Sequence, residues 1–92
     1  MSNGKKMTRL EAEGYIDTLR DYFAEVYPCG SYRRGKGLVG DFDVAVIELD
    51  PARFADKVLR LSKQLGGTIT RAGGQIAILE TAVGHQLDLY RT

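Results

Sequence analysis

Two aspartates, Asp41 and Asp43, stand two positions apart where an apolar run begins. If that run is a β-strand, their side chains point to the same face, because successive side chains alternate between the two faces of a sheet. Carboxylate oxygens are the hard ligands that Mg²⁺ prefers. The pair therefore predicts a divalent-cation site, although an isolated Asp-x-Asp pair is also common on exposed strand ends that bind nothing.

The segment ahead of these aspartates is rich in glycine and carries two arginines. It begins Gly30-Ser31-Tyr32-Arg33-Arg34-Gly35 and reaches Gly40 just before the first aspartate. Backbone N–H groups of such a loop and an arginine guanidinium bind phosphate groups. We expect a nucleoside triphosphate to rest on Gly30, Ser31, Arg34 and the backbone near Gly40.

A third aspartate, Asp88, lies in the pattern Gln86-Leu87-Asp88-Leu89-Tyr90. The two leucines alternate with polar residues, so Asp88 is expected on the face opposite a core-facing pair. Three carboxylates on one sheet face would repel one another unless a cation or a proton relieves them.

This set of residues suits metal-assisted nucleotidyl transfer. Two Mg²⁺ ions can clamp the attacking and leaving oxygens of an in-line displacement. Asp41 and Asp43 would bridge both ions. If its strand pairs beside theirs, Asp88 would bind the second ion and help to take the proton of the attacking hydroxyl.

Composition indicates one small soluble domain. The chain has 92 residues, of which 43% are hydrophobic and 27% charged, with a net charge near +1. No apolar run is long enough to span a bilayer, so we expect no membrane association. The single cysteine, Cys29, excludes an internal disulfide and fits a reducing, cytoplasmic compartment, and its simplest interpretation is a small buried residue. The lone His85 cannot build a histidine metal cluster and is assigned to a loop.

Helix signals flank the glycine-rich segment. Thr8-Arg9-Leu10-Glu11 has the form of a capping box, and apolar residues then recur at helical spacing to about Tyr27, where Pro28 closes the helix. Asp50-Pro51 opens a second helix that Gly66-Gly67 ends. Its basic stripe, Arg53, Lys57, Arg60 and Gln64, could contact a phosphate backbone, but a solvated helix surface is the favoured interpretation.

Alternating and β-branched stretches predict the strands. They cover residues 41–48, 68–71, 75–80 and 86–90, and the last three are joined by glycine-containing turns. The order of elements predicts an α+β fold, a small mixed or antiparallel sheet with two main helices packed on one face. We expect a flexible tail over residues 1–7 and a single domain over residues 8–92.

The motifs also resemble a known family. Gly30-Ser31-Tyr32-Arg33-Arg34-Gly35 followed by Gly40-Asp41-Phe42-Asp43-Val44 is similar to the Gly-Ser-Phe-Arg-Arg-Gly and Gly-Asp-x-Asp signature of family X DNA polymerases, within the DNA polymerase beta-like nucleotidyltransferase superfamily. Gln86-Leu87-Asp88-Leu89 looks like the strand that supplies that family's third catalytic aspartate. The resemblance implies a palm fold, catalytic and metal-binding roles for Asp41, Asp43 and Asp88, and triphosphate contacts from Ser31, Arg34 and Gly40.

The resemblance also implies a substrate, a metal and a restricted activity. The expected activity is addition of deoxynucleotides to a DNA 3′ end with two Mg²⁺ ions, for which Mn²⁺ can substitute. The chain has Gln86 where many family members place an arginine near the primer, and it ends at Thr92, where the family continues into a thumb. We therefore expect a palm-only enzyme that binds a DNA primer and template weakly and extends slowly.

Two alternatives remain open. One is a small stand-alone nucleotidyltransferase of the antitoxin type that modifies a protein or an RNA. The other is a non-catalytic nucleotide-binding palm, which retention of all three aspartates argues against. A homo-oligomer is also plausible, because a second copy would cover sheet surface in so small a domain.

Overall fold

The computed structural model describes residues 5–35 and 37–92. The helices are α1 (Arg9–Arg20), α2 (Gly30–Arg33) and α3 (Pro51–Gln64). The strands are β1 (Met7–Thr8), β2 (Val26–Pro28), β3 (Leu38–Val39), β4 (Phe42–Val46), β5 (Thr68–Ala72), β6 (Ile76–Glu80) and β7 (Gln86–Arg91). These elements form an α+β fold, as the sequence predicts.

Side-chain caps begin the two long helices where the sequence predicts them. The Thr8 Oγ1 atom accepts a hydrogen bond from the Glu11 N–H at 3.1 Å, and the Glu11 carboxylate accepts one from the Thr8 N–H at 2.9 Å. Asp50 caps α3 by accepting from the Ala52 N–H at 2.9 Å, with Pro51 in the first turn. Gly66, which follows α3, has a φ of +63°, the left-handed conformation common after a helix C-terminus.

The end of α1 differs from the prediction. The helix ends at Arg20 instead of continuing to Tyr27, and Val26–Pro28 forms strand β2. Phe23 and Val26 are nevertheless buried in the core. The apolar spacing of these two residues reflects their burial in the core. Residues can be buried in a loop or a strand as well as in a helix, so the spacing did not mark the end of α1.

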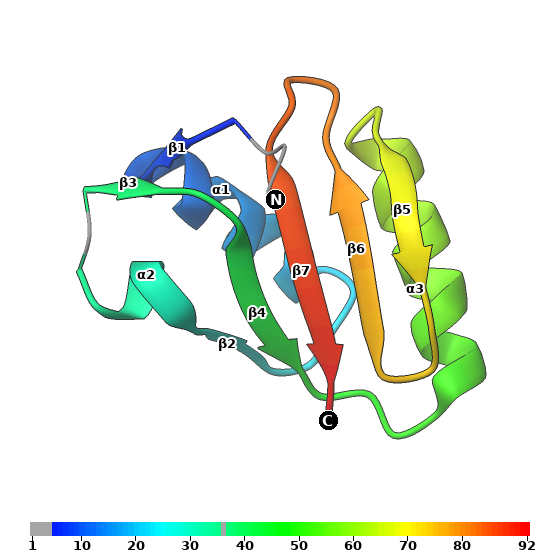
Figure 1. The fold of residues 1–92 in the computed structure, drawn as a ribbon. Helices are drawn as coiled ribbons and strands as arrows, with labels where there is room; N and C mark the ends of the chain where they lie inside the picture. Colours follow the sequence, from blue (N-terminus) through cyan, green and yellow to red (C-terminus); the bar gives the residue numbers. More distant parts are fainter. Residues whose placement is uncertain (1–4, 36) are drawn as a thin grey trace.

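The main sheet contains five strands in the order β2-β4-β7-β6-β5 (Figure 1). Strands β4 and β7 pair in parallel, whereas the other neighbours are antiparallel, so the sheet is mixed. Strand β4 is shorter than the predicted 41–48 strand, and Asp41 immediately precedes it.

A second, two-stranded sheet joins β1 to β3, with Met7 opposite Val39. Met7 is fully buried, so it belongs to the folded domain and not to the predicted flexible tail. Residues 1–4 of that predicted tail lie outside the described residues.

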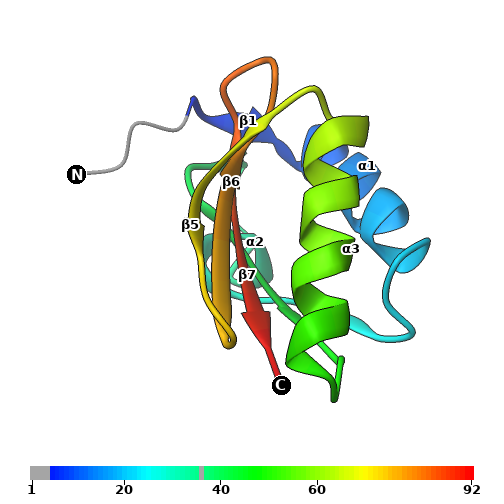
Figure 2. The same cartoon turned by 90° about the vertical axis from the view of Figure 1, so that its right-hand side faces the viewer.

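Helices α1 and α3 both cover the same face of the main sheet (Figure 2). The hydrophobic core fills the space between the two layers, because alternate strand residues point toward the helices. Its fully buried members from the central strands are Phe42, Val44, Val46, Leu79, Leu87 and Leu89. Among the described residues no helix lies on the opposite sheet face, which presents the residues between these core positions.

In the described part of the chain, no helix has the length and hydrophobicity that crossing a bilayer requires.

Candidate active site

Strands β4 and β7 place two of the predicted carboxylates side by side. Asp43 lies directly opposite Asp88 in the parallel ladder, and the pairs on either side, Phe42 with Leu87 and Val44 with Leu89, are buried in the core. Because these apolar neighbours are anchored against the helices, both aspartates must point to the uncovered face. The strand that carries Asp88 therefore lies beside the strand that follows Asp41, which is the condition under which Asp88 can join the other two aspartates.

The three aspartates interact electrostatically. Asp88 is half-buried, and burial is the largest cause that raises its pKa above the ordinary value of 3.8. A hydrogen bond from the Gln86 amide, 2.9 Å from Asp88 Oδ1, acts in the opposite direction. The charges of Asp43 and Asp41 raise the pKa further, as does a hydrogen bond between the side chains of Asp88 and Asp43. The carboxylates therefore form one coupled group, as three like charges on a sheet face are expected to do.

Tyr90 also contacts the carboxylates, although the sequence predicts no role for it. Its hydroxyl donates a hydrogen bond to Asp43 Oδ1 at 3.4 Å from the neighbouring strand. Burial is the main cause that raises the pKa of Tyr90, followed by the charges of Asp43 and Asp88. The signal available in the sequence is the i, i+2 spacing of Gln86, Asp88 and Tyr90, which puts all three on one face.

The glycine-rich segment packs directly against Asp43. Gly30 has a φ of +63°, and a Cβ atom at this position would lie 2.6 Å from Asp43 Oδ2. The Cys29 N–H also donates to the Asp43 carbonyl oxygen at 2.8 Å. Position 30 therefore needs glycine both for its backbone conformation and for the close approach of the carboxylate.

Part of the predicted phosphate loop is the single-turn helix α2, and Tyr32 anchors it. The Tyr32 ring packs on Phe42 with ring centroids 5.4 Å apart, and the Arg9 guanidinium lies 4.1 Å above the same ring. Arg9 also donates to the Tyr32 carbonyl oxygen at 2.8 Å. These contacts connect α1, α2 and β4.

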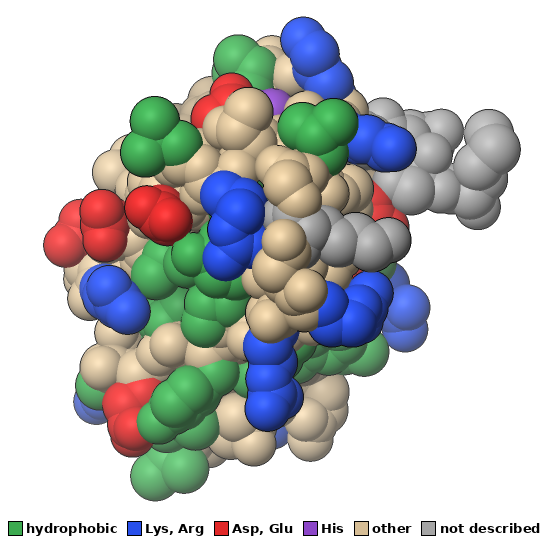
Figure 3. Space-filling view, turned by 90° about the vertical axis from the view of Figure 1, so that its left-hand side faces the viewer, with side chains coloured by type: hydrophobic (Ala, Val, Ile, Leu, Met, Phe, Trp, Pro, Cys, Tyr) green, Lys and Arg blue, Asp and Glu red, His purple; other side chains and the backbone are tan. Residues whose placement is uncertain are grey.

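The predicted triphosphate contacts flank this anchored turn. Ser31 is half-buried in α2, Arg34 follows α2 and is exposed, and Gly40 lies beside Asp41. Within the described ranges, Arg33 and Arg34 form no ion pair. Figure 3 shows Lys and Arg side chains distributed over the side of the molecule that carries α2 and β3. Lys36 of the predicted loop lies outside the described residues.

The carboxylates are at present engaged with other side chains. Among the residues that the structure describes, no three histidine, cysteine or acidic side chains form a group that could hold a metal ion as they stand. Asp88 is bonded to Gln86, and Asp43 to Tyr90. The donor set is nevertheless chemically suited to Mg²⁺, because it offers three hard carboxylates from neighbouring strands. Each of these two hydrogen bonds engages Oδ1, so both carboxylates keep further lone pairs that could bind an ion.

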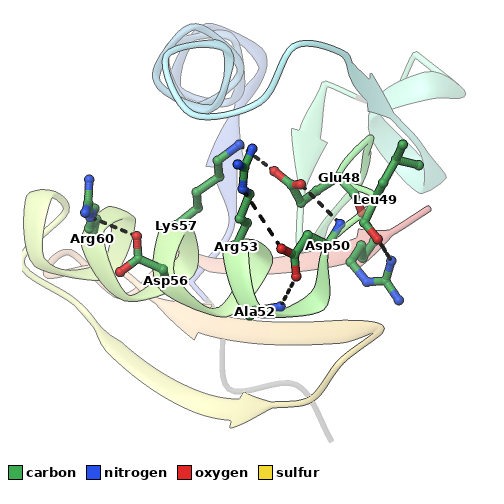
Figure 4. A network of polar contacts seen from close by, with 9 residues as sticks. Glu48, Leu49, Asp50, Ala52, Arg53, Asp56, Lys57 and Arg60 are labelled. Carbon is green, nitrogen blue, oxygen red and sulfur yellow. Dashed lines mark hydrogen bonds and ion pairs between the residues drawn. The ribbon is translucent and has the colours of Figure 1, made fainter.

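Unlike Arg33 and Arg34, the cations of the basic stripe on α3 lie next to carboxylates (Figure 4). Arg53 pairs with Asp50 at 4.0 Å, Lys57 with Glu48 at 2.5 Å, and Arg60 with Asp56 at 3.1 Å. Each of these cations is balanced by an acidic neighbour, which favours the interpretation of the stripe as a solvated helix surface.

Two single residues complete the comparison with the sequence. Cys29 was expected in the core but is only half-buried, and its thiol donates to the Tyr27 carbonyl oxygen. His85 lies in the turn between β6 and β7, as expected, yet it is almost fully buried, with Nδ1 2.6 Å from the Tyr15 hydroxyl.

No protein-family model matches this chain, and no curated protein matches its sequence significantly.

Proposed function

We propose that this chain is a metal-dependent nucleotidyltransferase, similar to family X DNA polymerases, that adds deoxynucleotides to a DNA 3′ end. One observation carries the proposal: Asp43 and Asp88 face each other in register on parallel strands, and Gly30 of the predicted phosphate segment packs against Asp43. A phosphate-binding loop and a carboxylate cluster in contact are the two parts that nucleotidyl transfer requires.

The mechanism assigns a role to each part of the site. Asp41, Asp43 and Asp88 would hold Mg²⁺, and the bound ion would supply neutralisation of phosphate charge and activation of the attacking hydroxyl. Ser31, Arg34 and the Gly40 N–H bind the triphosphate, and Arg34 stabilises the negative charge that develops on the leaving pyrophosphate.

Bond formation and proton transfer follow from these positions. The 3′-oxygen of the acceptor bonds to the α-phosphorus as the bond to pyrophosphate breaks. Asp88 accepts the hydroxyl proton and passes it to water.

Primer extension with labelled deoxynucleotides and Mg²⁺ tests the proposal. The Asp43→Asn substitution should lower the incorporation rate by at least about 100-fold, because it removes a charge from the metal-binding group. The matched control is Asp56→Asn, which changes an exposed aspartate of α3 that pairs with Arg60. Equal incorporation by the wild type and Asp43→Asn would refute the catalytic assignment.

Two other outcomes identify the alternatives. Transfer of label to a protein or an RNA, with none to a DNA primer, would indicate a nucleotidyltransferase with a different acceptor. Nucleotide binding that is unchanged by a chelator, without transfer to any acceptor, would indicate a non-catalytic nucleotide-binding domain.

A further inference from the structure

The uncovered face of the main sheet carries an apolar row beside the carboxylates. Tyr27 lies opposite Ala45, Ala45 opposite Tyr90, and Tyr90 opposite Ile76, so one row crosses β2, β4, β7 and β6. Tyr27 is 50% and Tyr90 37% exposed. Along β7 this row is two residues from the carboxylates, a separation of roughly 7 Å.

The carboxylates belong to a neighbouring row that ends in a cation. Asp43 lies opposite Asp88, Asp88 opposite Ile78, and Ile78 opposite Arg71 on the edge strand β5. Two strand spacings separate β7 from β5, so the Cα atom of Arg71 is roughly 10 Å from that of Asp88. This carboxylate row thus has two carboxylates in the middle of the sheet and an arginine at its edge.

Both rows lead to one hollow at the β5–β6 turn. The hollow has a volume of about 260 Å³ and is lined by Arg71, Ile76 and the turn residues 73–75. Ile76 belongs to the apolar row and Arg71 to the carboxylate row. An apolar wall and a guanidinium in one hollow suit a ligand with a flat apolar part and an anionic part.

The cation beside this hollow has no carboxylate partner in the part of the chain that the structure describes, which favours an anionic ligand there. Three cations of α3, Arg53, Lys57 and Arg60, are each paired with a carboxylate, whereas Lys63 of α3 forms no ion pair within the described residues. Over residues 5–35 and 37–92, Arg71 forms no ion pair. Its charge therefore remains available for a phosphate group.

We propose that this face binds a single-stranded nucleic-acid acceptor, whose path runs from the carboxylates across Tyr90 and Ile76 to the hollow at Arg71. This inference rests on the proposed function, because the carboxylates fix the position of the 3′ end. The terminal nucleotide lies at Asp43 and Asp88, the preceding base stacks on the Tyr90 ring, and its phosphate binds Arg71. Stacking on aromatic rings accepts any base, so the site needs no fixed sequence.

The first experiment measures binding without chemistry. Fluorescence anisotropy follows a short 5′-labelled oligothymidylate binding to the full 92-residue chain in Mg²⁺ without nucleoside triphosphate, so that no transfer occurs. Tyr90→Ala should weaken binding about tenfold through loss of stacking. Arg71→Gln should also weaken binding. The slope of the logarithm of affinity against the logarithm of salt concentration should fall by about 1, as expected for the loss of one phosphate contact.

Matched controls separate these effects from general ones. Lys63→Gln removes the same charge and Leu59→Ala removes an exposed apolar side chain, but both residues lie on α3. Neither should change the affinity. Tyr90→Phe keeps the ring and loses the hydrogen bond to Asp43, and it should retain oligothymidylate binding. Unchanged affinity in Tyr90→Ala and Arg71→Gln would overturn the proposal.

A second measurement uses the wild-type chain and does not depend on whether variants fold. An oligonucleotide with 5-iodouracil next to its 3′ end is photocrosslinked, and the attached residue is identified by mass spectrometry. The expected attachment is to Tyr90. Crosslinks confined to α3, or a dimer that buries Tyr90 and excludes the oligonucleotide, would overturn the acceptor path.

The two proposals fail in different ways. One possible result is that the wild type incorporates nucleotides while substitutions at Tyr90 and Arg71 leave oligonucleotide affinity unchanged. This result would refute the acceptor path but not the enzymatic function. Binding that depends on both residues, without incorporation into any acceptor, would support the path and refute the enzymatic function.

Discussion

Gly30 must have both an unusual backbone conformation and no side chain, because it lies against the Asp43 carboxylate. Its positive φ allows α2 to start beside β4, and the absence of a side chain lets Asp43 Oδ2 approach the backbone. A side chain here would disturb both the backbone and the carboxylate. Position 30 thus links the predicted phosphate segment to the carboxylates through a single contact.

A pair of glycine substitutions tests this statement. Gly30→Ala should lower the free energy of unfolding by about 1–2 kcal/mol, because left-handed backbone is costly for alanine and the new Cβ would meet Asp43. Gly14→Ala is the control, since it lies inside α1 with nothing within 4 Å of the added Cβ. It should raise stability by about 0.5–1 kcal/mol. Urea unfolding followed by circular dichroism measures both, and an equal effect of the two substitutions would contradict the argument.

At the scale of elements, Glu48 connects the end of β4 to α3. Its carboxylate accepts a hydrogen bond from Lys57 Nζ at 2.5 Å and one from the Asp50 N–H at 3.3 Å. The hydrogen bond from Lys57 is the largest cause that lowers the pKa of Glu48 below its ordinary value of 4.5, followed by the hydrogen bond from Asp50. Glu48 thereby fixes the first turns of α3 relative to the sheet.

This lowered pKa predicts a specific pH dependence of stability. A carboxylate with a lowered pKa in the folded state stabilises the protein fully above its unfolded-state value of 4.5, and the contribution is lost as the pH falls through the folded-state pKa. Glu48→Gln should therefore reduce stability at neutral pH, and the difference from the wild type should disappear in acid. Thermal unfolding across this pH range measures the difference. Glu13→Gln, an exposed substitution on α1, should change little.

Much of this element structure could be predicted because particular residues mark it. Asp50, Pro51 and Gly66 bound α3, and the capping box of Thr8 and Glu11 marks the start of α1. The end of α1 could not be placed, since apolar spacing continues to Val26 across a loop and a strand. The two-residue strands β1 and β3 are too short to show any period.

The sequence predicts the sheet face of the candidate carboxylates but neither their contacts nor the part of Tyr90. Alternation around Asp43 and Asp88 gives their face, whereas direct pairing of β4 with β7 depends on how distant strands associate. The close approach of Gly30 to Asp43 depends on the path of the intervening chain, which no local pattern reports. The role of Tyr90 depends on the same strand pairing, because its hydroxyl bonds to Asp43 across that ladder.

The whole molecule has two unlike faces. Two helices cover one side of the sheet, while the other side carries the aspartates, two exposed tyrosines and an arginine without an ion pair among the described residues. The net charge of +1 gives no sign of this difference between the two faces. Repulsion among Asp41, Asp43 and Asp88 is a cost to folding that a bound cation would remove.

Metal addition and removal should therefore change global stability. Mg²⁺ at ten times its dissociation constant should stabilise the wild type by about 1.4 kcal/mol, because it binds the folded chain in preference to the unfolded one. A chelator should reverse the effect, and Asp43→Asn should show a much smaller response. Thermal unfolding midpoints with and without Mg²⁺ measure the difference. The same rise in both proteins would show that these carboxylates do not hold the ion.

The parallel pairing of β4 with β7 also has a consequence for how the chain folds. The ladder joins residues 45 positions apart, and α3, β5 and β6 lie between them in the sequence. Closing so long a loop has an entropic cost before any contact compensates for it, so high contact order slows folding. The β5–β6 hairpin can form from neighbouring residues alone, whereas the aspartate pair exists only after the most distant strands have met. Amide hydrogen exchange should therefore find the β4–β7 ladder to be among the last structures protected during refolding, and any catalytic competence would appear with it.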